Sequence, residues 1–256
     1  MYFIDQFPLW LVYLLTVGLF LLVAEIGFRI GTLMHRRNPT AQKGPTTGAV
    51  VGSLLGLLAF LLAFTIGIVL NQHNQRKAMV VAEANAIGTS YLRASFLNET
   101  DRDATHDLLK EYVEVRIVGA ADPAHLESAL TRSEEIHGEL WSIVEDNTSE
   151  GQSSDIMALF VESVNDVIDV HTLRLTAGQM RLPRIFGWMF YAAAVVSFLL
   201  MGIVDSSDGE RNPTATVFFA LALVAVLMII VDLDRPFEGL LTISQTSMSD
   251  LLDTMR

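Results

Sequence analysis

Four long apolar stretches alternate with a polar middle section along the chain of 256 residues. They cover residues 7–24, 48–70, 185–204 and 213–231, and none of them contains a charged residue. A helix needs about 20 apolar residues to cross a hydrocarbon core of roughly 30 Å. The pattern therefore predicts four transmembrane helices, the first of which continues to about residue 34.

The middle section, residues 71–184, has helical periodicity and no alternating pattern of the kind that strands show. We expect the second span to continue as a long stalk helix, followed by three more helices. In the helix predicted for residues 124–145, Leu130, His137 and Val144 share one stripe, which predicts a packing face. The last helix is expected to run from about residue 154 towards Pro183 and into the third span.

The predicted fold class is therefore an all-α integral membrane protein. Its four transmembrane helices are split two and two around a helical extramembrane domain. The predicted divisions are a first pair of spans within residues 1–70, the extramembrane domain 71–184, a second pair within 185–232, and a juxtamembrane tail 233–256.

Composition supports a membrane protein and excludes several other classes. Hydrophobic residues make up 51% of the chain and the mean hydropathy is +0.42, more apolar surface than one soluble core can bury. The net charge of −12 argues against nucleic acid as a partner, because phosphate binding needs clustered Lys and Arg. The chain has no cysteine, which excludes disulfides and thiolate chemistry. We expect the lipid bilayer to be its main environment.

The distribution of Lys and Arg does not decide the orientation of the spans. One side would hold the basic residues of the two short loops: Arg36, Arg37, Lys43 and Arg211. The other would hold a larger set, part of which flanks the long domain, where the rule is weak: Arg76, Lys77, Arg174, Arg181, Arg184 and Arg235. The balance slightly favours a cytoplasmic first loop and an extramembrane domain on the outside.

The second span carries an ordered row of small residues, for which two interpretations remain open. The row consists of Gly48, Gly52, Gly56, Ala59, Ala63 and Gly67. Small residues at this spacing allow another helix to approach closely, so the row predicts a helix-packing face. Phe60 and Phe64 lie one turn apart on an adjacent line, as aromatic side chains do in a hydrophobic pore constriction.

Acidic residues in the last helix of the middle section are candidate ligands for a divalent cation. Glu162, Asp166 and Asp169 follow one another at helical spacing, and Glu83 on the stalk helix could complete the set. His171 is expected to point elsewhere on that helix. The alternative is that this acidic stripe faces water, as such stripes usually do.

The sequence DLDRPFEG follows the fourth span and also has two interpretations. Asp232, Asp234 and Arg235 precede Pro236, which is typical of a helix end with an Asp–Arg ion pair. Alternatively, Asp232, Asp234 and Glu238 coordinate a cation. No nucleophile with its base, phosphate-binding loop or cofactor motif is present, so we expect no resident cofactor and no enzyme activity.

Two stretches, VVAEANAIGTSYLRA at residues 80–94 and DLDRPFEGLLTIS at residues 232–244, resemble a bacterial family of bestrophin-like membrane proteins. The resemblance covers nearly the whole chain and includes AEIGFRIG after the first span and RLP before the third. It implies kinship with bestrophins, which are pentameric anion channels. Their four spans are also split two and two, and their second helix lines the pore with a hydrophobic neck.

The resemblance implies roles for particular residues. Phe60 and Phe64 match the neck by spacing, with Gly56 on the same helix, and Arg76 or Lys77 would lie where an anion pathway leaves the membrane. The acidic calcium clasp of bestrophins is not reproduced beyond two aspartates after the last span. Bestrophins also keep the extramembrane domain in the cytoplasm, against the weak charge-based orientation.

We therefore expect a homo-oligomeric channel of the bacterial inner membrane, with the second helix nearest the axis and an anion as the permeant ion. The helical domain would form its vestibule. The alternative is a non-conducting scaffold or sensor whose helical domain binds a protein partner or ligand. Metal-dependent catalysis in the helical domain is a third hypothesis.

Overall fold

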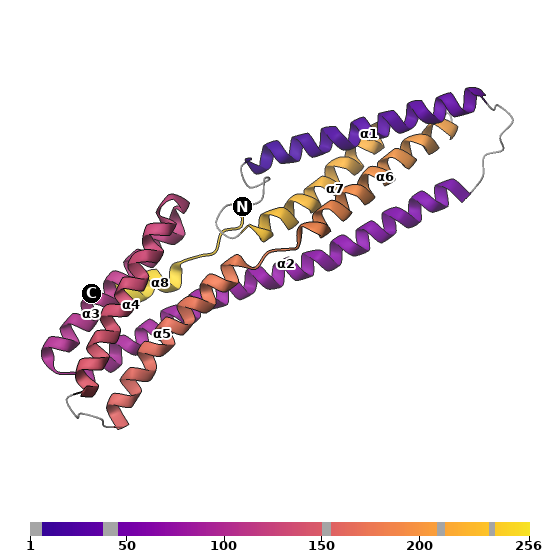
Figure 1. The fold of residues 1–256 in the computed structure, drawn as a ribbon. Helices are drawn as coiled ribbons and strands as arrows, with labels where there is room; N and C mark the ends of the chain where they lie inside the picture. Colours follow the sequence, from indigo (N-terminus) through magenta and orange to yellow (C-terminus); the bar gives the residue numbers. More distant parts are fainter. Residues whose placement is uncertain (1–6, 38–45, 150–154, 209–212, 236–238) are drawn as a thin grey trace. The chain divides into compact units, whose positions relative to one another are not determined.

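The computed structural model describes residues 7–37, 46–149, 155–208, 213–235 and 239–256, and all regular elements within them are helices (Figure 1). The chain forms two compact units. Unit 1 comprises residues 1–71 and 181–241, and unit 2 comprises residues 72–180 and 242–256. Each unit is thus assembled from two separate parts of the sequence.

Unit 1 contains the four apolar stretches. Its helices are α1 (Leu9–Arg37), the first part of α2 (Thr46–Arg93), α6 (Arg184–Asp208) and α7 (Pro213–Asp234). Each apolar stretch lies in a helix that is long and apolar enough to cross a membrane. The prediction of four membrane-spanning helices in an all-α chain is confirmed at this level.

Helices α1 and α6 run side by side and approach so closely that only glycine fits at their contact (Figure 1). A Cβ atom added at Gly27 would overlap the carbonyl oxygen of Leu199, and one added at Gly202 would overlap that of Ala24. At Gly31 the added atom would meet Ser206. Gly27 and Gly31 form the small-xxx-small pattern of closely packed membrane helices, so the chain uses this pattern on α1.

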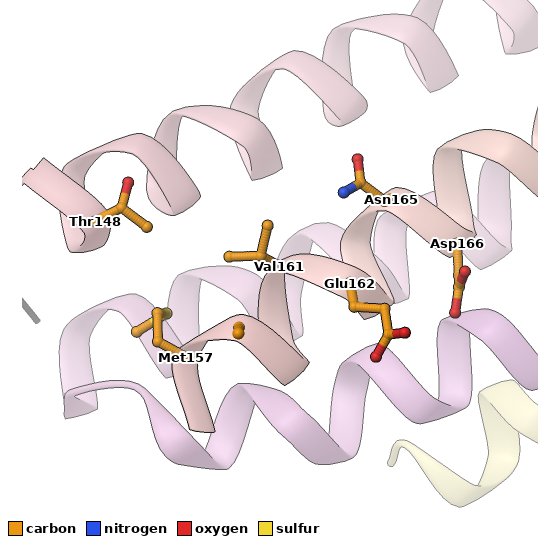
Figure 2. Close-up of a pocket in the computed structure, with 7 residues that line it drawn as sticks. Thr148, Met157, Val161, Glu162, Asn165 and Asp166 are labelled. Carbon is orange, nitrogen blue, oxygen red and sulfur yellow. The ribbon is translucent and has the colours of Figure 1, made fainter. Parts of the chain in front are cut away.

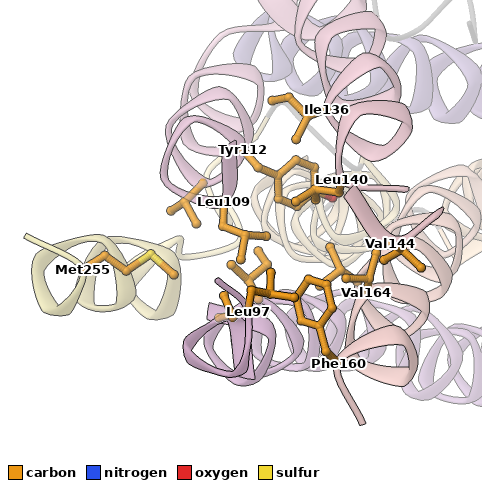
Figure 3. Packing of buried hydrophobic residues seen from close by; sticks show 14 of the residues in the cluster. Leu97, Leu109, Tyr112, Ile136, Leu140, Val144, Phe160, Val164 and Met255 are labelled. Carbon is orange, nitrogen blue, oxygen red and sulfur yellow. The ribbon is translucent and has the colours of Figure 1, made fainter. Parts of the chain in front are cut away.

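Unit 2 consists of the rest of α2 and helices α3 (Glu99–Ala121), α4 (Leu126–Ser149), α5 (Asp155–Gln179) and α8 (Thr246–Thr254), with short 3₁₀ turns before α3 and α4. Its apolar core draws on all five helices (Figure 3). The predicted face of α4 contributes to this core, because Val144 and His137 are buried and Leu130 is half-buried.

The structure corrects one prediction about a helix end. Helix α5 does not continue into the third span, because four non-helical residues, 180–183, separate it from α6. Pro183 disfavours helical geometry in the residue before it, and Asp234 accepts a hydrogen bond from the freed backbone N–H of Leu182. The predicted juxtamembrane tail 233–256 includes α8, whose Met248 is fully buried in the core of unit 2.

Candidate functional site

The small and aromatic residues of the second span lie on a face of α2 that the described chain leaves uncovered. An added Cβ atom would meet nothing within 4 Å at any of its four glycines, Gly48, Gly52, Gly56 and Gly67. Ala59 and Ala63 are exposed, as are Phe60 (68%) and Phe64 (64%). The opposite face packs within unit 1 through buried residues that include Leu58, Leu62, Thr65 and Val69.

The two basic residues predicted near the pore have different environments. Arg76 is buried, and its guanidinium donates hydrogen bonds to the carbonyl oxygens of Ala177 and Met180. These carbonyls lie at the C-terminal end of α5, so Arg76 caps that helix end. Lys77 is exposed.

A buried ionic cluster lies at the centre of unit 2, and we call it the Glu83 cluster: Glu83, Tyr112, Arg116, His171 and Arg174. The Glu83 carboxylate is fully buried and accepts hydrogen bonds from Arg116 Nε at 3.0 Å, Tyr112 Oη at 2.8 Å and Arg174. Arg174 also donates to the side chain of Gln245 at 2.8 Å. The cluster therefore ties α2, α3, α5 and the segment before α8 together.

The charges of the cluster are unbalanced, because one carboxylate faces two guanidinium groups. Burial opposes ionisation of Glu83, but the two arginines and their hydrogen bonds outweigh it and hold the pKa of Glu83 below its ordinary value. Burial, followed by the charge of Glu83, raises the pKa of Tyr112 well above its ordinary value. Glu83 is thus ionised and Tyr112 neutral at neutral pH.

The hydrogen bonds of Tyr112 indicate the tautomer of His171. The single hydroxyl proton of Tyr112 is donated to Glu83, so the hydroxyl oxygen accepts at 2.9 Å from a protonated Nδ1 of His171. The His171 Nε2 atom then lacks a proton, and it is buried with no hydrogen-bond partner among the described residues. His137 packs edge-on against this ring at 4.8 Å, and its Nε2 atom likewise has no hydrogen-bond partner in the described part of the chain.

The four carboxylates proposed as a metal site do not converge. Glu83 is held by the arginines, whereas Glu162, Asp166 and Asp169 are exposed on α5. Glu162 instead lies 3.5 Å from the guanidinium of Arg93. Across the described residues, no group of three or more His, Asp or Glu side chains is arranged to hold a metal ion.

An open cavity of about 480 Å³ lies beside this acidic row (Figure 2). Its lining is mostly apolar and comes from the end of α4 and the first turns of α5: Thr148, Met157, Ala158, Val161, Glu162, Asn165 and Asp166. Asn165 and Val161 extend from one side of α5 and Glu162 from another, so the cavity does not gather the carboxylates onto one point (Figure 2).

The two aspartates after the fourth span organise the backbone around them. Asp232 is buried and accepts hydrogen bonds from the backbone N–H groups of Leu240 and Leu241 at 2.8 and 3.1 Å. At Gly239, where φ is +152°, an added Cβ atom would overlap the Asp232 carboxylate. Asp232 thus holds the backbone of Leu240 and Leu241 against the end of α7.

Asp234 forms an ion pair with Arg181, whose Nε atom lies 3.1 Å from the carboxylate. The neighbouring Arg235 is buried and donates a hydrogen bond to the carbonyl oxygen of Phe7 at 3.3 Å. Glu238, the third predicted cation ligand of this motif, lies outside the described residues.

The two buried histidines predict that unit 2 loses stability in acid. Burial lowers the pKa of both His137 and His171 to about 4, and for His171 the charge of Arg116 contributes further. Between pH 6.5 and 4 the unfolded chain therefore binds more protons than the folded chain, so the free energy of unfolding falls as the pH falls through this window. A fall in pKa from 6.5 to about 4 corresponds to about 3 kcal/mol per histidine.

The prediction is tested by thermal unfolding of the purified protein in detergent across this pH range. The variant His137→Gln/His171→Gln should show a much flatter dependence above pH 4.5, and His125→Gln, which changes an exposed histidine, should behave as the unchanged protein. An equal slope in the double variant and the unchanged protein would contradict the assignment.

The fold of the chain is similar to that of solved bacterial membrane proteins. A comparison with curated proteins gives no match. Solved structures of a bacterial bestrophin homologue from Klebsiella pneumoniae share its fold: the one solved by zinc SAD phasing has a TM-score of 0.69 at 13% identity over 94% of this chain and 96% of that chain. A leucine-to-threonine variant of the homologue has a TM-score of 0.69 at 14% identity over 95% and 97% of the two chains.

A structure described as a membrane protein with a proline-to-alanine substitution also matches, with a TM-score of 0.69 at 13% identity over 95% of this chain and 96% of that chain. The bestrophin-like domain family matches residues 16–248, which include most of α1, the other three candidate membrane helices and most of unit 2. The chain therefore belongs to the bestrophin-like family of membrane proteins.

Proposed function

We propose that the chain forms a homo-oligomeric ion channel in the bacterial inner membrane, with the membrane part of α2 nearest the pore axis. The uncovered face of α2 is the observation that supports this. Its opposite face is packed on the chain's own helices, whereas Phe60, Phe64 and the row of small residues have no cover within the described chain. In a ring of subunits this face would surround the axis.

The aromatic pair suits a gate. Phe60 and Phe64 lie one turn apart on a helix segment without charge, so repetition around a ring would give two stacked apolar rings. Apolar constrictions of this kind gate by excluding water. The small residues beside them would allow neighbouring subunits to approach closely.

The division of the spans follows the order of the helices. Helices α1 and α2 would cross the membrane first, unit 2 would follow as the extramembrane domain, and α6 and α7 would return through the membrane. Unit 2 follows directly from the predicted span 48–70 along α2, so it would form the vestibule of the pore. A reporter fused at the C-terminus would show which side it faces.

The proposal is tested by the oligomeric state and by ion flux. We expect a ring in mild detergent and measurable flux in liposomes, with a severalfold increase in flux in Phe60→Ala/Phe64→Ala because the apolar constriction is widened. Leu22→Ala is the matched control, since this residue is similarly exposed (58%) but lies on α1. A monomer in mild detergent would contradict the channel.

The second candidate is a non-conducting sensor whose unit 2 binds a partner or ligand. The Glu83 cluster favours this candidate. Glu83 lies on α2 and is bonded to Arg116 of α3 and Arg174 of α5, so a displacement of α3 or α5 on ligand binding would also displace α2. A ring in which the unchanged protein and the double phenylalanine variant both show negligible flux would support this candidate. For the proposed channel, the bestrophin resemblance implies an anion as the permeant ion.

A further inference from the structure

Two buried histidines meet where α4 packs against α5. His137 on α4 and His171 on α5 are exposed by only 8% and 4%, and their rings lie edge to face with the ring centres 4.8 Å apart. Tyr112 of α3 packs beside both rings. Neither Nε2 atom has a hydrogen-bond partner among the residues that the structure describes. Buried polar atoms without partners cost stability, so the pair needs an explanation that the proposed pore does not supply.

The charges around the pair disfavour a further positive charge. Arg116 of α3 and Arg174 of α5 are the nearby cations, and Glu83 of α2 is the nearby carboxylate, with an oxygen 3.9 Å from His171 Nδ1. This carboxylate already accepts hydrogen bonds from both guanidinium groups. The segment before α8 contributes the neutral amide of Gln245. A proton added to either ring would therefore introduce a charge that Glu83, already paired twice, cannot neutralise.

Acid consequently favours any conformation in which the two rings reach water. Burial is the main reason that the pKa of both histidines falls to about 4, whereas a histidine in water has a pKa of about 6.5. Between these two values an exposed ring binds a proton and the buried ring does not. At pH 5 the resulting preference for the exposed conformation is about 30-fold for each ring. Two rings that are released together would give a steep response to pH.

The histidines lie on a seam between α4 and α5 that is incompletely packed. His137 faces His171, and further along α4 Thr148 shares a cavity with Met157 and Val161 of α5 (Figure 2). The two helices therefore run antiparallel, and the cavity of about 480 Å³ lies on the same seam as the histidines. Because the cavity leaves one end of the seam unfilled, the histidine contact carries a larger share of the attachment of α4 to α5.

Other contacts attach α4 and α5 to different helices. Helix α4 packs mainly on α3, where Arg132 forms an ion pair with Glu111 at 2.6 Å and Asn147 donates a hydrogen bond to Asp101 at 2.7 Å. Helix α5 is attached to α2 and α3 by the Glu83 cluster. Helix α4 can therefore tilt on α3 and part from α5 while both sets of bonds are kept.

We propose that the contact of His137 with His171 is an acid-released latch on the seam between α4 and α5. While both rings are neutral, the latch holds α4 against α5. Protonation of the pair releases α4 and opens the apolar seam to water, whereas the Glu83 cluster keeps α2, α3 and α5 together. Unit 2 thereby senses pH, a property that goes beyond the proposed channel and does not depend on conduction.

Trp141 reports the state of the latch. It lies on α4 one turn after His137, and its half-buried side chain packs against the core of unit 2. In the variant Trp10→Phe/Trp188→Phe it is the remaining tryptophan of the three. We expect the quenching of its fluorescence by acrylamide, which is uncharged, to rise severalfold as the pH falls from about 6.5 to about 4.5 and to reverse when the pH is restored. The helix content measured by circular dichroism should stay constant.

Further substitutions in this background assign the response to the pair. Adding His137→Gln/His171→Gln should abolish the rise in quenching, whereas adding His125→Gln, at an exposed position just before α4, should leave it unchanged. His137→Gln alone should give a shallower rise, because one proton instead of two drives the release. A rise of the same size in the double glutamine variant would overturn the latch.

Hydrogen–deuterium exchange on the unchanged protein tests the latch without any substitution. After correction for the intrinsic effect of pH on exchange, peptides from α4 should exchange faster at about pH 4.5 than at about pH 6.5, and peptides from α2 and α3 should not. Equal acceleration in all helices of unit 2 would show loss of the whole fold and would overturn the proposal, as would unchanged exchange in α4. Neither measurement requires conduction, so the latch and the channel stand or fall separately.

Discussion

Replacement of Glu83 by glutamine is expected to destabilise unit 2 by about 3–5 kcal/mol, because it leaves two buried guanidinium groups without their counter-charge. Glutamine keeps the shape of the side chain, so the packing around it is preserved and the loss is electrostatic. The thermal unfolding midpoint in detergent, followed by circular dichroism, should fall strongly. The structure motivates this size of effect because Glu83 is fully buried and both arginines are nearly so.

Glu162→Gln makes the same chemical change at an exposed ion pair and should cost about 1 kcal/mol or less. The double variant Glu83→Gln/Arg174→Met should recover part of the lost stability, because it removes one of the two unpaired charges. A midpoint for Glu83→Gln equal to that of Glu162→Gln would show that the cluster is not a stabilising centre.

Valine at Gly27 is expected to disrupt the packing of the membrane unit. Its Cβ atom alone would overlap the backbone carbonyl of Leu199, which cannot move without separating α1 from α6. Overpacking of this kind costs about 1–3 kcal/mol, and contact with backbone instead of a flexible side chain favours the upper end. The fraction of folded protein during titration with sodium dodecyl sulfate measures the loss.

Gly18→Val is the matched control on the same helix, because an added Cβ atom at Gly18 meets nothing within 4 Å. It should leave the titration midpoint nearly unchanged. Equal midpoints for the two variants would mean that α1 and α6 are not held in the close contact described. Gly202→Val, which acts from the opposite helix, should reproduce the effect of Gly27→Val.

The membrane helices could be predicted from sequence because lipid imposes a simple rule on length and polarity, and all four apolar stretches lie in suitable helices. The interruption of the helix at residues 180–183 could not be predicted from sequence, because it depends on hydrogen bonds to residues that are remote in sequence. Arg76 caps the end of α5, and Asp234 bonds the backbone of Leu182. Helix α8 was missed because a short amphipathic segment carries a weak signal beside long apolar spans.

The contacts of the buried charged residues could not be predicted from sequence either. Helical spacing placed Glu162, Asp166 and Asp169 on one exposed row, but it could not show which helix would face Glu83. The structure supplies arginines there, and it brings His171 into the same cluster. The signal that could have indicated this was the presence of Arg116 and Arg174 in otherwise amphipathic helices. A helical pattern can show that an arginine lies on the buried face of its helix. It cannot show which residue of another helix the arginine contacts.

The position of α8 has a consequence for how the protein is made. Met248 and Met255 complete the core of unit 2, in which Figure 3 labels Met255. Both residues follow all four membrane helices in the order of synthesis. The core of unit 2 therefore cannot close until all four membrane helices have been synthesised, so the translocon handles both helix pairs while that core is still open.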